Sequence, residues 1–409
     1  AKMEFVEAIM NDPQLAAGTA AAGVLTIVLA LYAMTKRKMV RDCNDYQTIS
    51  GSTSMLANED SVLEFGKVKE SVNEYFDLFS GARKNVGTIS DKDSIEHREA
   101  EYQTMLVNFY DLVTDFYEWG WGQSFHFAPR WKAESFMESI KRAEYHLVNV
   151  LNMREGTRAL DVGCGVGGPM RNMAIHSGAK IDGVTINEYQ VRVGNKYNER
   201  MGLADRCASH QGDFQKLDEK FEAGTFDCAY EIEATCHSPN KTDTFLQVAH
   251  CLKKGGLFAG YEWVMCGDYD PNNKDHVRIK EGIEVGNGLP TLHSGEYVVK
   301  SLEDAGFEVI EAYDANRGVH DPAQIPWYET LNGTWSLSGF RMTWAGRMCT
   351  HMLVNVLEFL RIAPAGSAKV NLEPNPNPNP KPKPRPQALR LSPPNPNPKG
   401  VVHAQRHRD

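Results

Sequence analysis

The stretch "RALDVGCGVGGP", residues 158–169, indicates the fold class of this chain. Its first half is an apolar run of strand length, and its second half holds four glycines among the six residues 163–168. Gly163, Gly165 and Gly168 satisfy the pattern G-x-G-x-x-G, in which glycine permits a tight turn at a helix start and a close approach of backbone to a ligand. The motif alone is a hypothesis, so the surrounding sequence must supply its context.

Segments with the character of buried strands and amphipathic helices alternate after this turn. A helix is expected at 242–254, because Phe245, Val248 and Leu252 share one face. The expected strands are 158–163, 180–186, a segment before residue 212, 226–235 and 256–265. Strands that alternate with helices predict an α/β domain with a Rossmann-like, doubly wound parallel sheet.

The acid before the glycine turn separates two classes of cofactor. Asp161 stands two residues before the first glycine and Gly167 adds a further one, which gives the form D-x-G-x-G-x-G. This form resembles the first motif of S-adenosylmethionine-dependent methyltransferases. A nicotinamide enzyme usually has an apolar residue at Asp161 and an acid directly after the second strand, where this chain has Asn187 and then Glu188. The sequence therefore favours a methyltransferase with S-adenosylmethionine as cofactor over a dehydrogenase.

A second acid follows the third expected strand, in "GDF", residues 212–214. In methyltransferases of this class an acid there accepts a hydrogen bond from the adenine amino group, and Asp213 is the candidate. Its alternative role is to cap the loop, because aspartate favours turns for its own reasons. The residues expected to bind the cofactor are Asp161, Gly163, Gly165, Gly167, Asn187, Gln190 and Asp213.

Composition excludes several kinds of partner. A formal net charge of −9 offers no basic surface for nucleic acid. The eight cysteines lack the paired spacing of a metal site, and we expect no bound metal. Their scatter fits reduced thiols in a protein that faces the cytosol better than it fits a disulfide scaffold.

Residues 15–34, "LAAGTAAAGVLTIVLALYAM", carry no charge, and a helix of that length rises about 30 Å, enough to cross the hydrocarbon core of a bilayer. Basic residues follow at 36–38 and 41, which predicts that the downstream chain stays in the cytoplasm. The alternatives are a buried soluble helix or a signal peptide, but a signal peptide has its basic residues before the apolar run. We expect residues 1–41 to be a membrane anchor.

An unusual aromatic segment, "FYEWGWGQSFHF", occupies residues 116–127, and six of its twelve residues are aromatic. The alternation of a half-buried strand holds only from Tyr117 to Trp121, and Gly120 and Gly122 weaken a helix. From composition alone, an ordinary packing interface explains these side chains as well as a binding site does.

From about residue 102 to residue 370, the sequence resembles the sterol 24-C-methyltransferases, and in detail the green algal and plant enzymes that accept cycloartenol. The motifs that carry the resemblance are "YEWGWGQSFHFAPRW" (117–131), "LDVGCGVGGP" (160–169), "IEATCHSP" (232–239), "YEWVM" (261–265) and "EVGNGLP" (284–290). The chain departs from the family at Asn287, where an acid is usual, and at Glu231, where a small residue is frequent.

The resemblance implies a carbocation mechanism. The alkene of a sterol side chain attacks the methyl group of the sulfonium, a hydride shifts from carbon 24 to carbon 25, and a base removes a proton. Aromatic faces stabilise a buried cation by about 2 kcal/mol or more per desolvated ring, and they do not trap it chemically. The resemblance therefore assigns this role to the aromatic segment, with Glu118 balancing positive charge.

The deprotonating base is left open among four residues. Glu233 and His237 follow the fourth strand, at the end where α/β sheets build their sites. His126 and Glu262 are rivals, and similarity to cyclopropane-forming methyltransferases favours His237 slightly. The expected catalytic residues are Tyr117, Glu118, Trp119, Trp121, His126, Glu233 and His237; the expected substrate-binding residues are Phe125, Phe127, Tyr261, Glu262, Trp263 and Glu284.

We expect five regions along the chain. After the anchor come a helical lid and sterol-binding region at 42–150, the cofactor-binding core at 151–275, and a sterol-side region at 276–370 with helices near 271–290 and 336–362. Residues 371–409 are rich in proline and expected to be disordered. Members of the family end in a last strand of the sheet, and the composition of this tail predicts that the strand is absent.

Three functions remain open from sequence. The first is a sterol methyltransferase of the endoplasmic reticulum membrane with its catalytic domain in the cytosol, and the second is a methyltransferase of squalene or related triterpenes. The third is an inactive, membrane-anchored binding protein that lacks the last strand. The expected partners are a sterol and a membrane, and self-association into a homo-oligomer is left open.

Overall fold

The computed structural model describes residues 68–79, 87–265, 267, 269–315, 323–325, 333, 340, 343–359 and 400–406. The expected membrane span at 15–34 and most of the proline-rich tail lie outside these residues. Within the part of the chain that is described, no helix combines the length and the apolar character needed to cross a bilayer.

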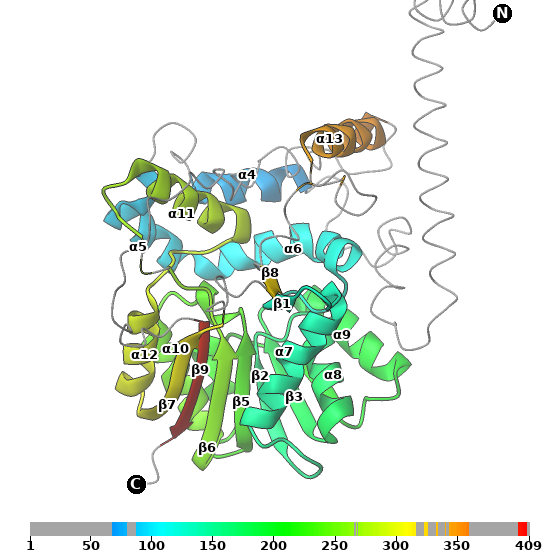
Figure 1. Cartoon of the computed structure of the whole chain (residues 1–409), viewed down its shortest axis with the longest axis vertical. Helices are drawn as coiled ribbons and strands as arrows, with labels where there is room; N and C mark the ends of the chain where they lie inside the picture. Colours follow the sequence, from blue (N-terminus) through cyan, green and yellow to red (C-terminus); the bar gives the residue numbers. More distant parts are fainter. Residues whose placement is uncertain are drawn as a thin grey trace, which may run out of the picture.

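A seven-stranded sheet with the order β4-β3-β2-β5-β6-β9-β7 forms the centre of the molecule (Figure 1). Its strands are β2 (Arg158–Val162), β3 (Lys180–Thr185), β4 (Cys207–Gln211), β5 (Phe226–Ile232), β6 (Leu252–Tyr261), β7 (Phe307–Asp314) and β9 (Gly400–Arg406). β2 to β6 pair in parallel, whereas β9 is antiparallel to both of its neighbours. The Rossmann-like parallel sheet predicted from the sequence is confirmed.

The strand that was expected to be missing is present, and that expectation is wrong. β9 lies between β6 and β7, with Ala259 opposite His403 and Val309 opposite Ala404. The segment "GVVHAQR" pairs with β6 along one edge and with β7 along the other, so its backbone groups have hydrogen-bond partners on both sides. A composition argument missed it because a seven-residue strand does not outweigh the proline-rich stretch before it.

Helices cover both faces of the sheet. α7 (Phe136–Val150) and α8 (Gly168–Ser177) pack on one face, and α10 (Lys241–Cys251) and α12 (Gly295–Asp304) on the other. α9 (Glu188–Arg200) packs beside β4. The boundary between α10 and β6 lies earlier than expected, because Leu252 already has extended dihedral angles and ends the helix at Cys251.

A helical lid lies over the carboxyl edge of the strands (Figure 1). It contains α4 (Val68–Leu78), the short η2 (Thr88–Ser90), α5 (Lys92–Ala100), α6 (Tyr102–Trp121) and α11 (Lys274–Asn287). An apolar cluster that includes Tyr75, Met105 and Phe109 joins its helices. The buried Arg98 donates to the carbonyl oxygens of Ile89 and Pro290, so segments far apart in sequence share one buried cation.

α6 continues through the aromatic segment to Trp121, although its glycines weaken a helix. Tertiary contacts compensate, because acids on α6 accept hydrogen bonds from residues on α9. Asp111 accepts from Asn187 at 2.6 Å, and Asp115 accepts from Tyr189 at 2.5 Å. The helix ends where Gly122 adopts a φ of 92°, a value that side chains other than glycine rarely take.

Three further elements complete the described structure. β1 (Arg130–Trp131) and β8 (Gln324–Ile325) form a small antiparallel ribbon. α13 (Trp344–Phe359) lies on the lid side of the molecule (Figure 1).

Candidate functional site

The glycine turn between β2 and α8 is shaped as its motif predicts. Gly163, Gly165 and Gly167 all have positive φ values, of 87°, 54° and 76°. At Gly168 an added Cβ would lie 2.1 Å from the carbonyl oxygen of Gln123, so this glycine lets the end of the lid approach the start of α8. The turn is thus fixed both by its own backbone and by contact with the aromatic segment.

A cavity that is partly open to solvent lies beside this turn at the carboxyl end of the strands. This edge of an α/β sheet is where such folds usually bind their ligands. Of the predicted cofactor residues, five line the cavity: Asp161, Gly163, Gly165, Gln190 and Asp213. Lid side chains form the opposite wall, namely Tyr102, Leu106, Tyr110, Gln123, Phe125 and His126.

Asn187 does not line the cavity itself; it positions the start of α9, which follows β3 and carries Gln190 to the cavity wall. Its side chain caps α9 by accepting a hydrogen bond from the Gln190 amide at 3.0 Å. The Gln190 side chain accepts from Thr185 and donates to Thr114, so it is fixed from both the core and the lid. The sequence order asparagine, then glutamine three residues later, thereby places one polar side chain at the cavity.

Asp213 combines its two expected roles. It caps η3 (Phe214–Glu219) by accepting a hydrogen bond from the Gln215 amide at 2.8 Å, and it also lines the cavity. Its second oxygen accepts from the Tyr102 hydroxyl and, at 2.6 Å, from the Gln103 side chain. The carboxylate predicted to contact adenine therefore also holds the start of α6 in place.

Asp161 is a buried carboxyl on the cavity wall. It accepts a hydrogen bond from the Tyr230 hydroxyl at 2.9 Å. Burial raises the pKa of Asp161 to about 7, and the Tyr230 hydrogen bond only partly opposes this. A cationic ligand beside it would favour its ionised form.

Glu233 occupies a strained position at the end of β5. Its φ is 53°, a region that non-glycine residues rarely adopt and that is concentrated at functional sites. The carboxyl group accepts hydrogen bonds from the Phe127 amide at 3.0 Å and from the Trp263 side chain. Burial raises the pKa of Glu233 to about 7, with the His126 charge opposing this effect, so the group can hold or release a proton near neutral pH.

His237 is held in its neutral form. Its Nδ1 lies 3.0 Å from the Gly288 carbonyl oxygen, which identifies Nδ1 as the protonated nitrogen. Nε2 then accepts from the Tyr110 hydroxyl at 2.9 Å. Burial lowers the pKa of His237 to about 4, so this side chain is a weak base.

His126 has a different charge state. Its Nδ1 faces the Phe127 carbonyl oxygen at 3.0 Å, and its Nε2 faces Glu144 at 3.3 Å. Burial by itself lowers the pKa of His126, but the hydrogen bond to Glu144 and the charge of that residue outweigh it and raise the pKa above its usual value. In its protonated form the ring donates both N–H groups to these acceptors and can balance the charge of nearby acids.

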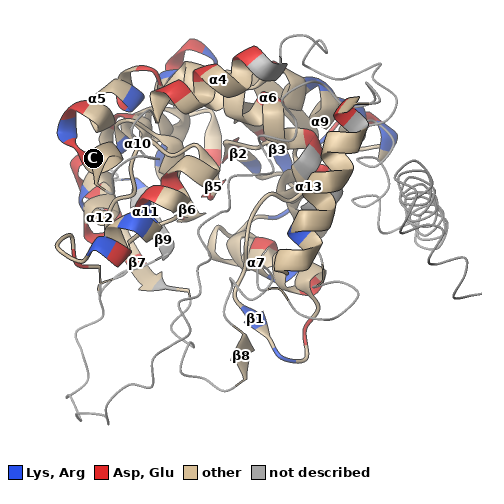
Figure 2. Ribbon diagram, turned by 90° about the horizontal axis from the view of Figure 1, so that it is seen from above, with Lys and Arg blue, Asp and Glu red and all other residues tan. Residues whose placement is uncertain are grey.

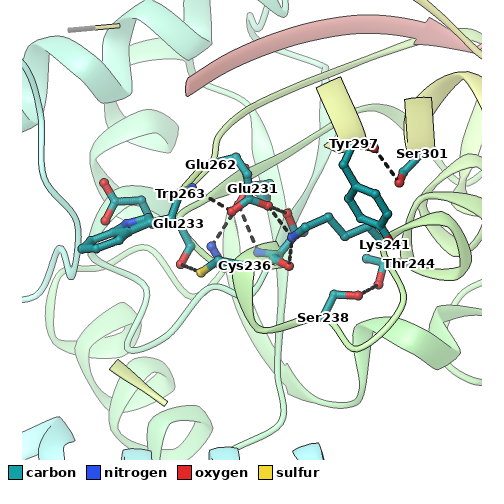
Figure 3. Close-up of polar contacts among 12 residues, drawn as sticks. Glu231, Glu233, Cys236, Ser238, Lys241, Thr244, Glu262, Trp263, Tyr297 and Ser301 are labelled. Carbon is teal, nitrogen blue, oxygen red and sulfur yellow. Dashed lines mark hydrogen bonds and ion pairs between the residues drawn. The ribbon is translucent and has the colours of Figure 1, made fainter. Parts of the chain in front are cut away.

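A buried network supports the loop that carries Glu233 and His237 (Figure 3). Lys241 donates to the Thr235 carbonyl oxygen at 2.7 Å and to Glu262 at 2.9 Å. Glu231 accepts from the backbone amides of Ala234 and Thr235, and burial followed by the Glu262 charge raises its pKa well above the usual value. Glu262 is thus part of a structural ion pair and does not line the cavity.

The aromatic segment contributes unequally. Phe125 lines the cavity, and Tyr117 packs edge-on against it with ring centroids 5.4 Å apart. The ring centroids of Phe127 and Trp263 lie 5.9 Å apart, and the Trp263 side chain donates a hydrogen bond to Glu233. The side chains of Trp119 and Trp121 lie outside the described residues.

Three predicted site residues point elsewhere. Glu118 accepts from Tyr197 at 2.7 Å on the α9 side, and the prediction that it balances charge in the cavity has no support in this geometry. Tyr261 donates to the Ala143 carbonyl oxygen on the α7 face. Glu284 pairs with Lys280 and accepts from the Leu292 amide at 2.8 Å, inside the lid.

Sequence reasoning missed the lid residues of the site. Tyr102, Leu106 and Tyr110 recur every four residues, so α6 turns one stripe toward the cavity. That periodicity was available in the sequence, but apolar and aromatic residues at helical spacing are usually core, and only the docking of α6 shows which stripe faces the ligand.

The site suits a cationic nucleotide-like cofactor. Its lining combines polar side chains, including Asp161, Gln190, Asp213 and Glu233, with apolar and aromatic ones. The two buried acids can neutralise a sulfonium, and the glycine turn leaves its backbone open to the ligand. S-adenosylmethionine meets these requirements.

Comparisons with known proteins agree with this geometry. The family model for mycolic acid cyclopropane synthetases matches residues 97–337, and a model for the C-terminal region of sterol methyltransferases matches residues 337–372. Cycloartenol-C-24-methyltransferase 1 of Oryza sativa subsp. japonica is 41% identical over 323 residues, which are 79% of this chain and 90% of that protein. Cycloartenol-C-24-methyltransferase of Arabidopsis thaliana is 43% identical over 277 residues, 68% of this chain and 81% of that protein. Sterol 24-C-methyltransferase of Saccharomyces cerevisiae is 40% identical over 310 residues, 74% of this chain and 78% of that protein.

Proposed function

Because this chain belongs to the family of S-adenosylmethionine-dependent sterol 24-C-methyltransferases, we propose that it methylates carbon 24 of a cycloartenol-like sterol. The observation that carries the proposal is the Glu233 carboxyl group, which lines the cofactor cavity beside an aromatic wall and has a pKa of about 7. A base of that strength is what the last step of alkene methylation requires.

S-adenosylmethionine supplies an electrophilic methyl group on a sulfonium. The lid lies over the carboxyl edge of the sheet, and its α6 stripe lines the cavity there and limits the access of water to the reacting carbon. The π electrons of the sterol alkene would form the new bond to the methyl carbon while the sulfur–methyl bond breaks and its electron pair stays on sulfur, which leaves as the neutral thioether S-adenosylhomocysteine. The cation left at carbon 25 then moves to carbon 24 as a hydride shifts from carbon 24 to carbon 25. Phe125 lines the cavity and offers a π face to this cation, and Tyr117 packs against the Phe125 ring.

Glu233 then removes the proton. Its ionised form accepts a proton from the substrate cation, and the electrons of the broken carbon–hydrogen bond form the new alkene. The hydrogen bonds from Phe127 and Trp263 hold the carboxyl group in place without donating a charge. His237 is less suited to this step, because Nε2 already accepts the Tyr110 hydroxyl and its pKa is about 4.

Product analysis tests the proposal. The purified protein is given S-adenosylmethionine with cycloartenol and squalene together, and the products are identified by mass spectrometry. Methylated cycloartenol is expected; methylated squalene alone would reassign the substrate to open-chain triterpenes, and cofactor binding without any product would contradict the enzymatic function.

The same proposal includes a membrane location. Residues 15–34 support an anchor, and the basic residues after them support a cytosolic catalytic domain on the endoplasmic reticulum. Deletion of residues 1–40 is expected to lower the membrane-bound fraction of the protein and to leave cofactor binding intact. Retention of the truncated protein on membranes would show that another segment anchors it.

A further inference from the structure

α13 exposes an apolar face on the lid side of the molecule. Its sixteen residues place large apolar side chains at spacings of three and four: Trp344, Met348, Met352, Val356 and Phe359. Trp344 is 80% exposed, Met352 is 62% exposed and Phe359 is 87% exposed. We call these five side chains the α13 stripe.

α13 turns its large apolar side chains outward, whereas an ordinary surface helix turns them toward the protein. Gly346 and Val354 are buried on the side that faces the protein, while the stripe faces away from it. A surface helix of a soluble domain normally turns its polar face outward. The exposed Asn355 also lies on this face, which is otherwise apolar. An exposed face of this kind marks an interaction surface rather than isolated exposed side chains.

We propose that the α13 stripe lies in the surface of a lipid bilayer. The helix is too short to cross a membrane, because sixteen residues rise only about 24 Å. Its charged residues, Arg347 and Glu358, lie together at one edge of the stripe, as expected for a helix that lies in the plane of the interface. Figure 2 shows α13 as a mostly uncharged ribbon.

Two features of the chain favour a bilayer over a protein partner. The stripe begins with Trp344, and tryptophan concentrates at the boundary of hydrocarbon and headgroups; it ends with Phe359, an exposed apolar ring that suits the hydrocarbon side. The uncharged run at 15–34 gives the chain a second segment suited to the same bilayer.

The lid position of α13 also connects it to the substrate. The inference rests here on the proposed function, since a sterol dissolves in the bilayer and must leave it to reach the cavity. Docking through α13 would turn the lid side of the molecule, and not the opposite end of its sheet, toward the lipid (Figure 1).

Cys349 allows a direct test, because it is an exposed thiol on α13 next to Met348. In the full chain, Cys43 and Cys266 are replaced by serine, and Cys349 is labelled with an environment-sensitive fluorophore; the other described free cysteines are buried. The control carries Cys349→Ser and Leu246→Cys, which places the label at an exposed apolar position of α10. Both proteins are floated with phosphatidylcholine vesicles, and the vesicle-bound fraction is examined.

Docking predicts a blue-shifted emission and protection from iodide for the label at Cys349, and neither change for the α10 label. Equal iodide access at both positions, or no vesicle-bound fraction, would overturn the proposal. Protection of Cys349 before vesicles are added would also overturn it, because another part of the chain or a second copy would then cover the stripe.

A variant separates docking from chemistry. Met348→Ser, Met352→Ser and Phe359→Ser together should lower turnover of vesicle-embedded sterol about tenfold or more. Residues 15–34 still tether the chain, but the lid side is no longer turned toward the bilayer that holds the sterol. Turnover of detergent-dispersed sterol should stay unchanged, and the control Ile175→Ser with Leu246→Ser should change neither rate. Equal losses in vesicles and detergent would overturn the docking role. A parent protein inactive on sterol in both forms would instead contradict the proposed function, and the label experiment would still decide docking.

Discussion

The backbone amide of Phe127 donates a hydrogen bond to Glu233 Oε1, with nitrogen and oxygen 3.0 Å apart. This contact joins the aromatic segment after the lid helix to the end of β5, two parts of the chain separated by 106 positions. The hydrogen bond holds the buried Glu233 carboxyl group beside aromatic side chains. The same carboxyl group also accepts a hydrogen bond from Trp263 and lines the cavity. The reactive end of the site therefore depends on the docking of the lid onto the sheet.

Glu233→Gln should remove the base and keep the shape of the site. General-base catalysis contributes about 10²- to 10⁴-fold, so turnover should fall within that range. In the parent protein kcat/KM should rise with pH through about 7, where the Glu233 carboxyl group of the ligand-free enzyme ionises, and this contribution should disappear in the variant. Rates measured from pH 5 to about 9 would decide, and a variant with the parental rate and profile would exclude Glu233 as the base.

His237→Gln provides the matched comparison for that measurement. His237 already accepts the Tyr110 hydroxyl, so its replacement should lower thermal stability and turnover without changing the pH profile. If the pH dependence of the rate changed in His237→Gln and persisted in Glu233→Gln, His237 would be the base and Glu233 would not.

Cofactor binding should release protons near neutral pH. The pKa values of Asp161 and Glu233 are both about 7 in the ligand-free site, and a sulfonium beside them favours their ionised forms. The affinity for S-adenosylmethionine should therefore rise with pH up to about 7 and level off above it. The neutral thioether S-adenosylhomocysteine should show much less of this dependence.

Calorimetry in buffers of different ionisation enthalpy measures these protons directly. Asp161→Asn should reduce the number of protons released and should weaken the binding of S-adenosylmethionine more than that of S-adenosylhomocysteine. The comparison variant Tyr230→Phe removes only the hydrogen bond to Asp161. Identical proton release for both ligands would show that the sulfonium charge is not what the acids respond to.

Tyr117→Leu and Tyr117→Phe distinguish cation stabilisation from packing. Leucine keeps apolar bulk and removes the π face, so methylation should slow about tenfold or more, which corresponds to 1.4 kcal/mol. Phenylalanine should keep most of the rate, because the edge-on contact with Phe125 needs only the ring. Turnover, sterol affinity and melting temperature are measured for both; equal turnover in the two variants would leave packing as the only role of Tyr117.

Lys241→Met should destabilise the protein by about 3–5 kcal/mol, because it leaves the buried Glu262 carboxylate without its partner. Lys241→Met with Glu262→Gln should recover part of this loss, since the amide still accepts from Thr235 and carries no charge. Urea unfolding measures both free energies. A double variant less stable than Lys241→Met would show that charge burial is not the cause.

The sequence by itself determined the fold class, the glycine turn and the position of two acids at the ends of strands. These features are local: four glycines must accept a tight turn, and a strand boundary places Asp161 and Glu233 at the carboxyl edge of the sheet. The family resemblance then supplied the reaction. It could not rank the four candidate bases, because their ability to take a proton depends on burial and on hydrogen-bond partners from distant segments.

Tertiary structure decided which of those residues meet. Glu118 lies in the aromatic segment, yet the docking of α6 turns it toward Tyr197, while Tyr102 and Tyr110 on the same helix face the cavity. β9 is a strand because it pairs with β6 on one side and with β7 on the other. Its own seven residues do not predict this pairing. Local sequence fixes which backbone shapes are allowed, whereas long-range packing sets which side chain reaches the ligand and how strongly it holds a proton.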